Sequence, residues 1–345
     1  MRGLVVDAKG VLSIAELPMP KINPYQALVR LRSCGVCNGT DMKLIHRAFK
    51  NFDTYPAVLG HEGVAEVVQV GSRVASLHVG DKVLLPFLEG MSGEYHSGWG
   101  AYSEYAVVGD AKAYESDGLQ VPSEAYFAQS VLSPDDKADD AGAAMIITFR
   151  EVLSAIRRFG MRPNKNLVVF GAGPVGLCFI RFARLLGLGK ILAVDIDEEK
   201  VKTAKAMGAD EAFNSLHCDV NKEIRGRLPN GADYVVDAVG VNALINQAMG
   251  LIADHGKICC YGISPKLNME LDWSKAPYNW SLDFVQWPSK VEESEAHSQV
   301  MAWINMGVLN PMDFISHVIP FENILDAFRM LEEKRPGTKK IVIQF

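Results

Sequence analysis

Short apolar runs separated by turn residues occupy about the first 145 positions of the chain. These runs are apolar or rich in β-branched residues, and they lie at 4–6, 11–14, 27–31, 63–70, 82–85 and 102–108. Glycines and Asn-Pro or Gly-Asp pairs bound them, as is typical of strand ends. Many short strands without helices between them predict a compact, barrel-like β domain.

Helical and strand patterns alternate from about Asp139 onward. Helices are predicted at 141–159, 174–186, 198–207 and 241–253, and buried strands at 166–170, 190–195, 234–237 and 257–261. This alternation implies right-handed crossovers and therefore a parallel sheet. The segment 277–288 is aromatic and irregular, and after it the pattern predicts helices at 293–306 and 321–333 and a last strand at 340–345.

Composition and charge narrow the class of protein. A chain of 345 residues with 48% hydrophobic content is long enough for two cores. The net charge is −6 without a run of like charge, which argues against nucleic acid or an anionic membrane as the partner. Asp7 interrupts the position of a signal-peptide core, and glycines and Pro174 break the most apolar stretch, 167–180. Six cysteines are too few for a disulfide scaffold, so we expect a cytoplasmic protein with no membrane contact.

A glycine-rich turn follows the strand predicted at 166–170. It reads Gly171-Ala172-Gly173-Pro174-Val175-Gly176. In a dinucleotide-binding turn the first glycine permits the bend, the second lets a pyrophosphate approach, and the third lets helix and strand pack closely. The next predicted strand ends at Asp195, 24 positions after Gly171. A carboxylate there accepts hydrogen bonds from ribose hydroxyls and repels a 2′-phosphate, which favours NAD over NADP; the alternative is that Asp195 only caps a helix.

Two short segments carry possible metal ligands. Cys34-Gly35-Val36-Cys37 taken alone is half of a structural zinc site, a redox pair or two buried thiols. Further on, His61 and Glu62 stand between Gly60 and Gly63, ahead of a β-branched run. A catalytic zinc needs about three protein ligands and one exchangeable position, which this set suits. Taken alone, His61 is more often an ordinary loop or core histidine.

Together these motifs resemble the zinc-dependent medium-chain dehydrogenases/reductases, which include alcohol, sorbitol and threonine dehydrogenases, and the character is closest to the sorbitol dehydrogenase-like polyol enzymes. The resemblance rests on Cys37, on the segments 60–63, 79–83 and 98–105, and on the glycine loop at 171–176. It continues through 208–210, 231–233, 256–258 and 315–321. It implies a GroES-like β-barrel catalytic domain at 1–149 and 286–345 and a Rossmann domain with a doubly wound parallel sheet at 150–285. The active site is expected in the cleft between them.

The resemblance also implies roles for individual residues. Cys37 and His61 match zinc ligands, and Glu62 matches a carboxylate that is a ligand in sorbitol dehydrogenase and lies near the metal in many alcohol dehydrogenases. Thr40 lies near the hydroxyl that relays the substrate proton. The expected cofactor contacts outside the glycine loop and Asp195 are Lys200 at the adenosine ribose, Lys340 at the pyrophosphate, and Gly262.

The sequence departs from the family pattern in two places. Between Cys37 and Asp41 there is one residue more than the family's common spacing, so the place of Thr40 as relay is less direct. The third ligand of relatives is expected near position 148, but the stretch 144–149, which includes Thr148, has neither the cysteine of alcohol dehydrogenases nor the glutamate of polyol enzymes. The expected site is therefore one catalytic Zn²⁺ held by Cys, His, Glu and water. The lobe of four cysteines that holds a structural zinc in relatives is absent.

The implied activity is hydride transfer between NAD and a secondary alcohol. Water as the fourth ligand leaves room for a substrate with two oxygens, so a polyol, sugar alcohol or amino alcohol is expected. A possible pocket lining, with packing between domains or subunits as the alternative, consists of Tyr95, His96, Trp99, Tyr278, Trp280 and Trp287. The rival functions are a zinc-free quinone or enone reductase of the same superfamily and a non-catalytic NAD(H)-binding sensor.

The sequence also leads to an expectation about the oligomeric state. The segment 301–318, taken as part of the nucleotide domain, carries Met301, Trp303, Ile304, Val308 and Leu309, which is more apolar surface than one helix and a short turn can hide. Related enzymes pair their Rossmann sheets edge to edge near the position of residues 280–285. Pairing removes an exposed strand edge, so we expect a homodimer or a homotetramer.

Overall fold

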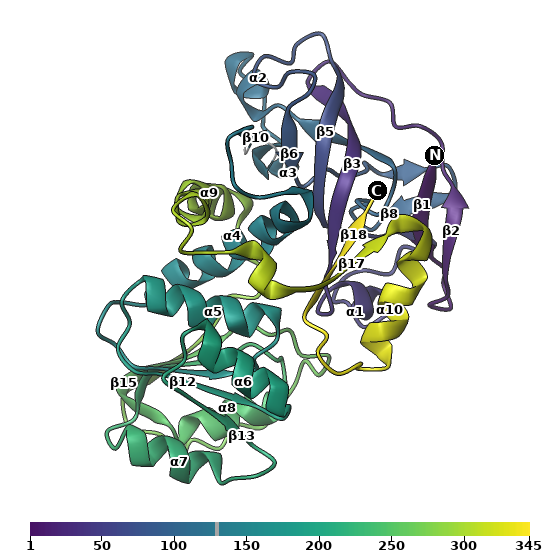
Figure 1. Ribbon diagram of the computed structural model, residues 1–345. Coiled ribbons are helices and arrows are strands. Elements are labelled where there is room, and N and C mark those ends of the chain that lie inside the picture. Colours follow the sequence, from purple (N-terminus) through teal and green to yellow (C-terminus); the bar gives the residue numbers. More distant parts are fainter. Residues whose placement is uncertain (128–130) are drawn as a thin grey trace. The chain divides into compact units, whose positions relative to one another are not determined.

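A computed structural model describes residues 1–127 and 131–345 of the chain (Figure 1). The chain divides into two compact units. The first consists of Met1–Arg150 and Ser289–Phe345, and the second of Glu151–Pro288. The first boundary lies within helix α4 (Asp140–Arg158), and the second comes just before helix α9 (Lys290–Asn305).

The first unit is built on two sheets. The larger has the order β10-β6-β5-β3-β18-β17, with β9 also paired to β3. Its strands are β3 (Gln26–Val36), β5 (Glu62–Val70), β6 (Lys82–Leu84), β9 (Tyr105–Gly109), β10 (Val131–Leu132), β17 (Ile315–Pro320) and β18 (Lys340–Gln344). The smaller sheet, β2-β1-β4-β8-β7, consists of β1 (Arg2–Val6), β2 (Leu12–Glu16), β4 (Ala57–Val58), β7 (Met91–Ser92) and β8 (Tyr95–Ser97).

One apolar core joins these sheets. Inward-facing strand residues such as Val29, Leu31 and Val67 are fully buried or nearly so, because alternate side chains of a strand point to the same face. Helix α10 (Ile324–Glu332) adds Phe328, whose ring meets that of Tyr102 edge-on at 5.8 Å. The other helical segments of this unit are α1 (Asp41–Ile45), α2 (Ala111–Ser116), α3 (Ser123–Phe127), η1 (Pro311–Phe314) and η2 (Phe321–Asn323).

The second unit is a six-stranded sheet in which every pairing is parallel. Its order is β13 (Glu211–Asn214), β12 (Ile191–Asp195), β11 (Leu167–Phe170), β14 (Ala232–Asp237), β15 (Ile252–Cys260) and β16 (Trp280–Phe284). The helices are α5 (Pro174–Leu185), α6 (Glu198–Met207), α7 (Val220–Arg227) and α8 (Asn242–Met249). Strand order reverses between β11 and β14, and ligands bind doubly wound sheets at such a point. The predicted fold class, a β domain with a doubly wound parallel sheet, is confirmed.

Two local predictions are wrong. The segment expected to be irregular contains β16, which pairs in parallel with β15 along Gly256↔Trp280 to Cys260↔Phe284. The helix expected to reach residue 253 ends at Met249, because Gly250 ends it and β15 begins at Ile252. In both places pairing within the sheet decides the structure, and a short aromatic or mixed run does not reveal that pairing by its own periodicity.

Segment 301–318 was expected to lie in the nucleotide domain, and this placement is wrong. The segment 301–318 belongs to the first unit, where it forms the end of α9, the turn η1 and part of β17. Met301, Ile304 and Leu309 are buried within this same chain. Their apolar surface therefore needs no second copy to cover it. Within the described residues, no helix has the length and apolar content needed to cross a bilayer.

Candidate active site

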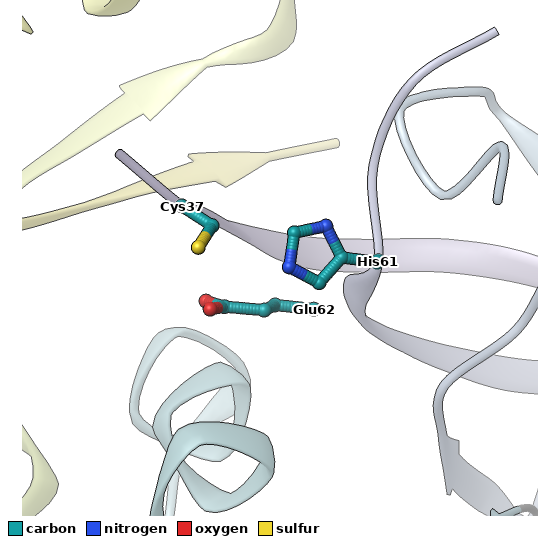
Figure 2. A group of neighbouring side chains, drawn as sticks. All are labelled: Cys37, His61 and Glu62. Atoms are coloured by element: carbon teal, nitrogen blue, oxygen red, sulfur yellow. The ribbon is translucent and has the colours of Figure 1, made fainter. Parts of the chain in front are cut away.

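Three side chains with metal-binding atoms converge where β3 ends and β5 begins. Cys37 follows β3, and His61 and Glu62 stand at the start of β5, which runs antiparallel to β3 with Gly35 opposite Glu62. Their ligand atoms all lie within 4.8 Å of one another, and the side chains point toward a common centre (Figure 2). Among the residues described, this is the one cluster of His, Cys, Asp and Glu suited to a metal.

The backbone before His61 is held in place by a glycine. Gly60 has a φ of +105°, and a Cβ atom at this position would lie 2.4 Å from the Tyr102 amide nitrogen. Any other residue would strain this turn and push the chain away from Tyr102. The turn therefore aims the His61 ring at Cys37, as the flanking glycines suggested.

Asp41, which the sequence analysis did not single out, orients both Cys37 and His61. Its carboxylate is fully buried, and its Oδ2 accepts hydrogen bonds from the Cys37 amide (3.0 Å) and the Tyr102 hydroxyl (2.7 Å). Its Oδ1 lies 3.4 Å from Nδ1 of His61. Carboxylates that face one ring nitrogen of a metal-binding histidine fix the ring and leave the other nitrogen for the metal.

The charges of this cluster shift the pKa values of two neighbours. Burial lowers the pKa of His61, but Asp41 and Cys37 outweigh it, so the pKa lies well above its ordinary value. Burial and the nearby Asp41 raise the pKa of the Tyr102 phenol well above its usual value, which keeps the hydroxyl as a hydrogen-bond donor. A thiol, an imidazole and a carboxylate brought together in a buried, electronegative site suit a zinc ion.

Glu62 is held by two further side chains. The Lys340 ammonium donates to both carboxylate oxygens, at 2.7 Å to Oε1 and 2.6 Å to Oε2. Thr148 donates its hydroxyl to Oε1 at 3.2 Å. The partner of Lys340 in the structure is therefore Glu62, and its expected contact with a pyrophosphate stays a prediction. Lys340 is only 4% exposed, and a lysine buried to this extent requires a carboxylate partner.

Thr40 and Trp99 lie beside the cluster. Thr40 is buried at the start of α1, and its amide points to the Cys37 sulfur at 3.4 Å. The role of its hydroxyl as proton relay stays a prediction. The Trp99 ring lies 5.6 Å from the His61 ring, and it is flanked by Phe49 and Phe52 at 5.8 and 6.4 Å.

The other aromatic residues of the expected pocket lining lie in both units, and the pocket itself stays a prediction. Tyr95 packs against the first unit's core, and His96 pairs with Ala57 between β8 and β4. In the second unit, Trp280 packs against the sheet core, whereas Tyr278 is fully exposed and Trp287 is 46% exposed. Phe49 and Phe52 were not predicted to lie near the site, although the regular spacing of aromatic residues at 49, 52 and 55 was visible in the sequence.

The glycine loop of the second unit joins β11 to α5. Gly171 has a φ of +93°, and a Cβ atom on Gly176 would lie 1.8 Å from the Gly171 carbonyl oxygen. Around Gly173, by contrast, no atom lies within 4 Å of the added Cβ position. The loop thus has two glycines required for its own packing and one that leaves open space. Pro174 and Val175 begin α5, whose free amides and positive dipole face this space.

Asp195 links the loop to the end of β12. Its Oδ2 accepts a hydrogen bond from the Ala172 amide at 2.7 Å, and its Oδ1 accepts from the amides of Ile196 and Asp197 at 2.8 and 3.1 Å. Lys200 lies in the first turns of α6, two residues after Glu198. Gly262 follows β15, where a Cβ atom would lie 2.1 Å from the Gly240 amide nitrogen. These positions all lie at the carboxyl edge of the parallel sheet.

Two family models match parts of the chain, and curated proteins and solved structures resemble it as well. The family model described as alcohol dehydrogenase GroES-like domain matches residues 23–117, and that described as zinc-binding dehydrogenase matches residues 174–282. An alcohol dehydrogenase of Geobacillus stearothermophilus is 32% identical over 274 residues, which covers 76% of this chain and 77% of that protein.

Two solved structures of similar fold illustrate the range of relatives. Galactitol-1-phosphate dehydrogenase from Escherichia coli superposes with a TM-score of 0.78 at 23% identity, covering 100% of both chains. 2R,3R-butanediol dehydrogenase from Bacillus subtilis superposes with a TM-score of 0.80 at 21% identity, covering 100% of this chain and 99% of that chain.

Proposed function

The chain belongs to the zinc-dependent medium-chain dehydrogenase/reductase family, and from this membership we propose that it oxidises secondary alcohols, in particular diols, sugar alcohols or amino alcohols, with NAD as hydride acceptor. The observation that carries the proposal is the convergence of the Cys37, His61 and Glu62 donor atoms within 4.8 Å. The names of two structural neighbours, a butanediol and a galactitol-1-phosphate dehydrogenase, favour a substrate with neighbouring hydroxyls.

Cys37, His61 and Glu62 are the residues that would hold a zinc ion. A bound zinc supplies Lewis acidity, which lowers the pKa of an alcohol hydroxyl. Asp41 holds the His61 ring with one nitrogen toward the metal position, as its 3.4 Å approach to Nδ1 supports. Thr40 lies next to Cys37, and its hydroxyl is the group we assign to take up the proton that the alcohol releases.

The glycine loop and Asp195 are the residues we assign to the dinucleotide. A bound NAD supplies the acceptor for the hydride. The free amides at the start of α5 receive the pyrophosphate, and Asp195 accepts hydrogen bonds from the ribose hydroxyls. Lys200, in α6, is the residue we assign to the adenosine ribose, and we assign Gly262 to the turn after β15, where a Cβ atom would lie 2.1 Å from the Gly240 amide nitrogen. The negative charge of Asp195 favours NAD over NADP.

The metal content that we propose is one catalytic zinc and no structural zinc. The sequence has no cysteine between Cys37 and Cys178, so a lobe of four close cysteines has no ligands in the first unit. The short strands β7 and β8 occupy the corresponding stretch.

We further propose a homodimer or homotetramer in the cytoplasm. Strand β16 is the last strand of its sheet and carries Phe284 at 58% exposure. An edge strand offers unpaired backbone groups, and pairing with a second copy satisfies them. Light scattering coupled to size exclusion tests this, and a 37.8 kDa species at micromolar concentration would contradict it.

The missing third ligand near position 148 supports a second candidate function. The stretch 144–149 lacks the third ligand expected near position 148, which favours a zinc-free quinone or enone reductase if zinc is not retained. A non-catalytic NAD(H) sensor, by contrast, has no use for a cluster of Cys37 with the buried His61 and Glu62.

The deciding experiment is a substrate panel combined with metal analysis. Polyols, inositols, amino alcohols, simple alcohols and quinones are assayed with NAD and with NADP, with and without a chelator. Zinc near one equivalent per chain and chelator-sensitive oxidation of diols support the proposal. Reduction of quinones or enones by a zinc-free protein would support the reductase, and NADH binding without any turnover would support the sensor.

A further inference from the structure

The third ligand position is the unusual feature of this metal site. Relatives are expected to carry a cysteine or glutamate ligand near position 148, but the stretch 144–149 has neither, and the hydroxyl of Thr148 is not among the usual zinc ligands. In the structure Thr148 donates a hydrogen bond to Glu62 at 3.2 Å instead. The third protein ligand must then come from Glu62, and the way its carboxylate is held determines which oxygen is available.

The two carboxylate oxygens of Glu62 accept different numbers of hydrogen bonds. Oε1 accepts from Lys340 at 2.7 Å and from Thr148 at 3.2 Å, whereas the described residues give Oε2 one donor, Lys340, at 2.6 Å. A carboxylate oxygen has about two lone pairs. Both lone pairs of Oε1 are therefore engaged, and Oε2 keeps one for a metal.

The strand register places Lys340 and Glu62 on the same face of the sheet. β3 is flanked by β5 on one side, with Gly35 opposite Glu62, and by β18 on the other, with Gly35 opposite Val342. Directly opposite residues share a face, as do residues two apart along one strand. Lys340 and Glu62 therefore meet over the face that Gly35 leaves bare.

The room for this contact depends on Gly35. A Cβ atom on Gly35 would lie 2.2 Å from Oε2 of Glu62. Glu62 is 2% exposed and Lys340 is 4% exposed, so water does not substitute for either partner. A buried ion pair with short, two-point contacts holds its geometry well.

We propose that Lys340 is a positioning residue which, together with Thr148, occupies Oε1 of Glu62 and presents Oε2 alone to the metal. Glu62 then serves as a one-oxygen ligand in place of the ligand missing near position 148. This inference rests on the proposed zinc-centred function. It assigns Lys340 to the metal site rather than to the dinucleotide.

The test uses the full chain stripped of metal and loaded with Co²⁺ alone. The visible spectrum reports coordination, because the d–d bands of four-coordinate cobalt are stronger than those of five-coordinate cobalt, and a thiolate band reports Cys37. The variants are Lys340→Met, Lys340→Arg, Thr148→Val and Glu62→Gln. Lys82→Met is the matched control, because it removes a lysine ion-paired to Asp140 in the same unit, away from the cluster. Circular dichroism checks the fold of each variant.

We expect Lys340→Met to free Oε1, so that both oxygens of Glu62 bind and the d–d absorbance falls by about twofold while the thiolate band stays. Thr148→Val should give a smaller fall, and Lys340→Arg should restore the original spectrum. Glu62→Gln should weaken Zn²⁺ binding by about tenfold or more, measured in competition with a chromophoric chelator. Lys82→Met should match the unmodified chain.

The possible failures are distinguishable. If the unmodified chain binds no cobalt, the proposed zinc-centred function is wrong, and this inference with it. If cobalt binds with the thiolate band but Lys340→Met and Thr148→Val give unchanged spectra, Lys340 does not position Glu62, although the function stands. Should Lys340→Met fail to fold, the unchanged spectrum of Thr148→Val is sufficient to overturn the inference.

Discussion

Replacement of Asp195 tests the assignment of the second unit to NAD. The side chain accepts three backbone hydrogen bonds, from Ala172, Ile196 and Asp197, at 2.7, 2.8 and 3.1 Å. Asp195→Ala removes the charge and also releases the Ala172 amide of the glycine loop. Asp195→Asn removes the charge but keeps one oxygen as acceptor. We therefore expect both variants to lose cofactor preference, and Asp195→Ala to lose more NADH affinity.

The magnitude follows from charge and distance. A 2′-phosphate with about two charges placed about 5 Å from a carboxylate is repelled by roughly 2–7 kcal/mol at effective dielectric constants between that of water and that of a protein surface, before screening by salt. A charge-assisted hydrogen bond to the ribose adds about 1.5–3 kcal/mol in favour of NAD. After solvent and salt reduce these terms, we expect the preference to fall by about 1–3 kcal/mol, or about 5- to 150-fold.

Fluorescence titration with NADH and NADPH measures this preference without any assumption about the alcohol. Asp197→Asn is the matched control, because Asp197 is an acid two residues away that caps α6 through the amides of Glu199 and Lys200. It should leave the NADH to NADPH ratio unchanged. Equal binding of both cofactors by the unmodified chain, or an unchanged preference in Asp195→Asn, would refute the reasoning.

Three further predictions concern the metal, the glycine loop and stability. Cys37→Ala or His61→Ala should abolish zinc content and alcohol oxidation but leave NADH binding intact, as metal analysis and fluorescence titration would show; retained zinc would contradict the ligand assignment. Gly176→Ala should weaken NADH binding by about tenfold or more, because its Cβ would lie 1.8 Å from the Gly171 carbonyl oxygen, whereas Gly226→Ala, with no atom within 4 Å, should not. Asp110→Ala should lower the free energy of unfolding by about 2–4 kcal/mol, because the buried carboxylate accepts from Ala75, Ser76 and Ala113. Burial raises the pKa of Asp110, but these hydrogen bonds outweigh it and hold the pKa below its ordinary value. The contribution of Asp110 to the free energy of unfolding is therefore present above about pH 4 and is lost as the pH falls through the lower folded-state pKa. Denaturant unfolding from pH 7 to pH 3 measures this, and an equal loss for Asp110→Ala at both ends would contradict it.

The fold was predictable where local patterns agree with long-range pairing. The buried runs that form β11 and β12 are continuous and bounded by loop residues, and they are the central strands of the parallel sheet. β16 was missed because an edge strand is only half-buried and its aromatic residues show no clear period. Very short strands such as β4 and β10 form only because a neighbouring strand offers hydrogen-bonding groups, which composition does not reveal.

The candidate site was predictable only in part. Cys37, His61 and Glu62 lie in short motifs with glycines that mark where the chain bends, so they could be found from the sequence. Asp41 entered the sequence analysis only as the end point of the spacing from Cys37, so its role in the site was overlooked. Its role depends on burial and on the simultaneous approach of Tyr102 and His61, which come from other parts of the chain.

Lys340 shows why the remaining part of the site depends on strand register. It is 278 positions from Glu62 in the sequence, and their side chains meet because β18 and β5 pair with opposite edges of β3. A slip of one residue in either pairing would turn one of the two side chains to the other face and leave a buried charge without its partner, at a cost of about 3–5 kcal/mol. The ion pair between Lys340 and Glu62 therefore stabilises this strand register over a shifted one, and the same register brings the metal-binding side chains together. Cys37 directly follows the last residue of β3, so one alignment of three strands places the thiol, the carboxylate and the lysine together.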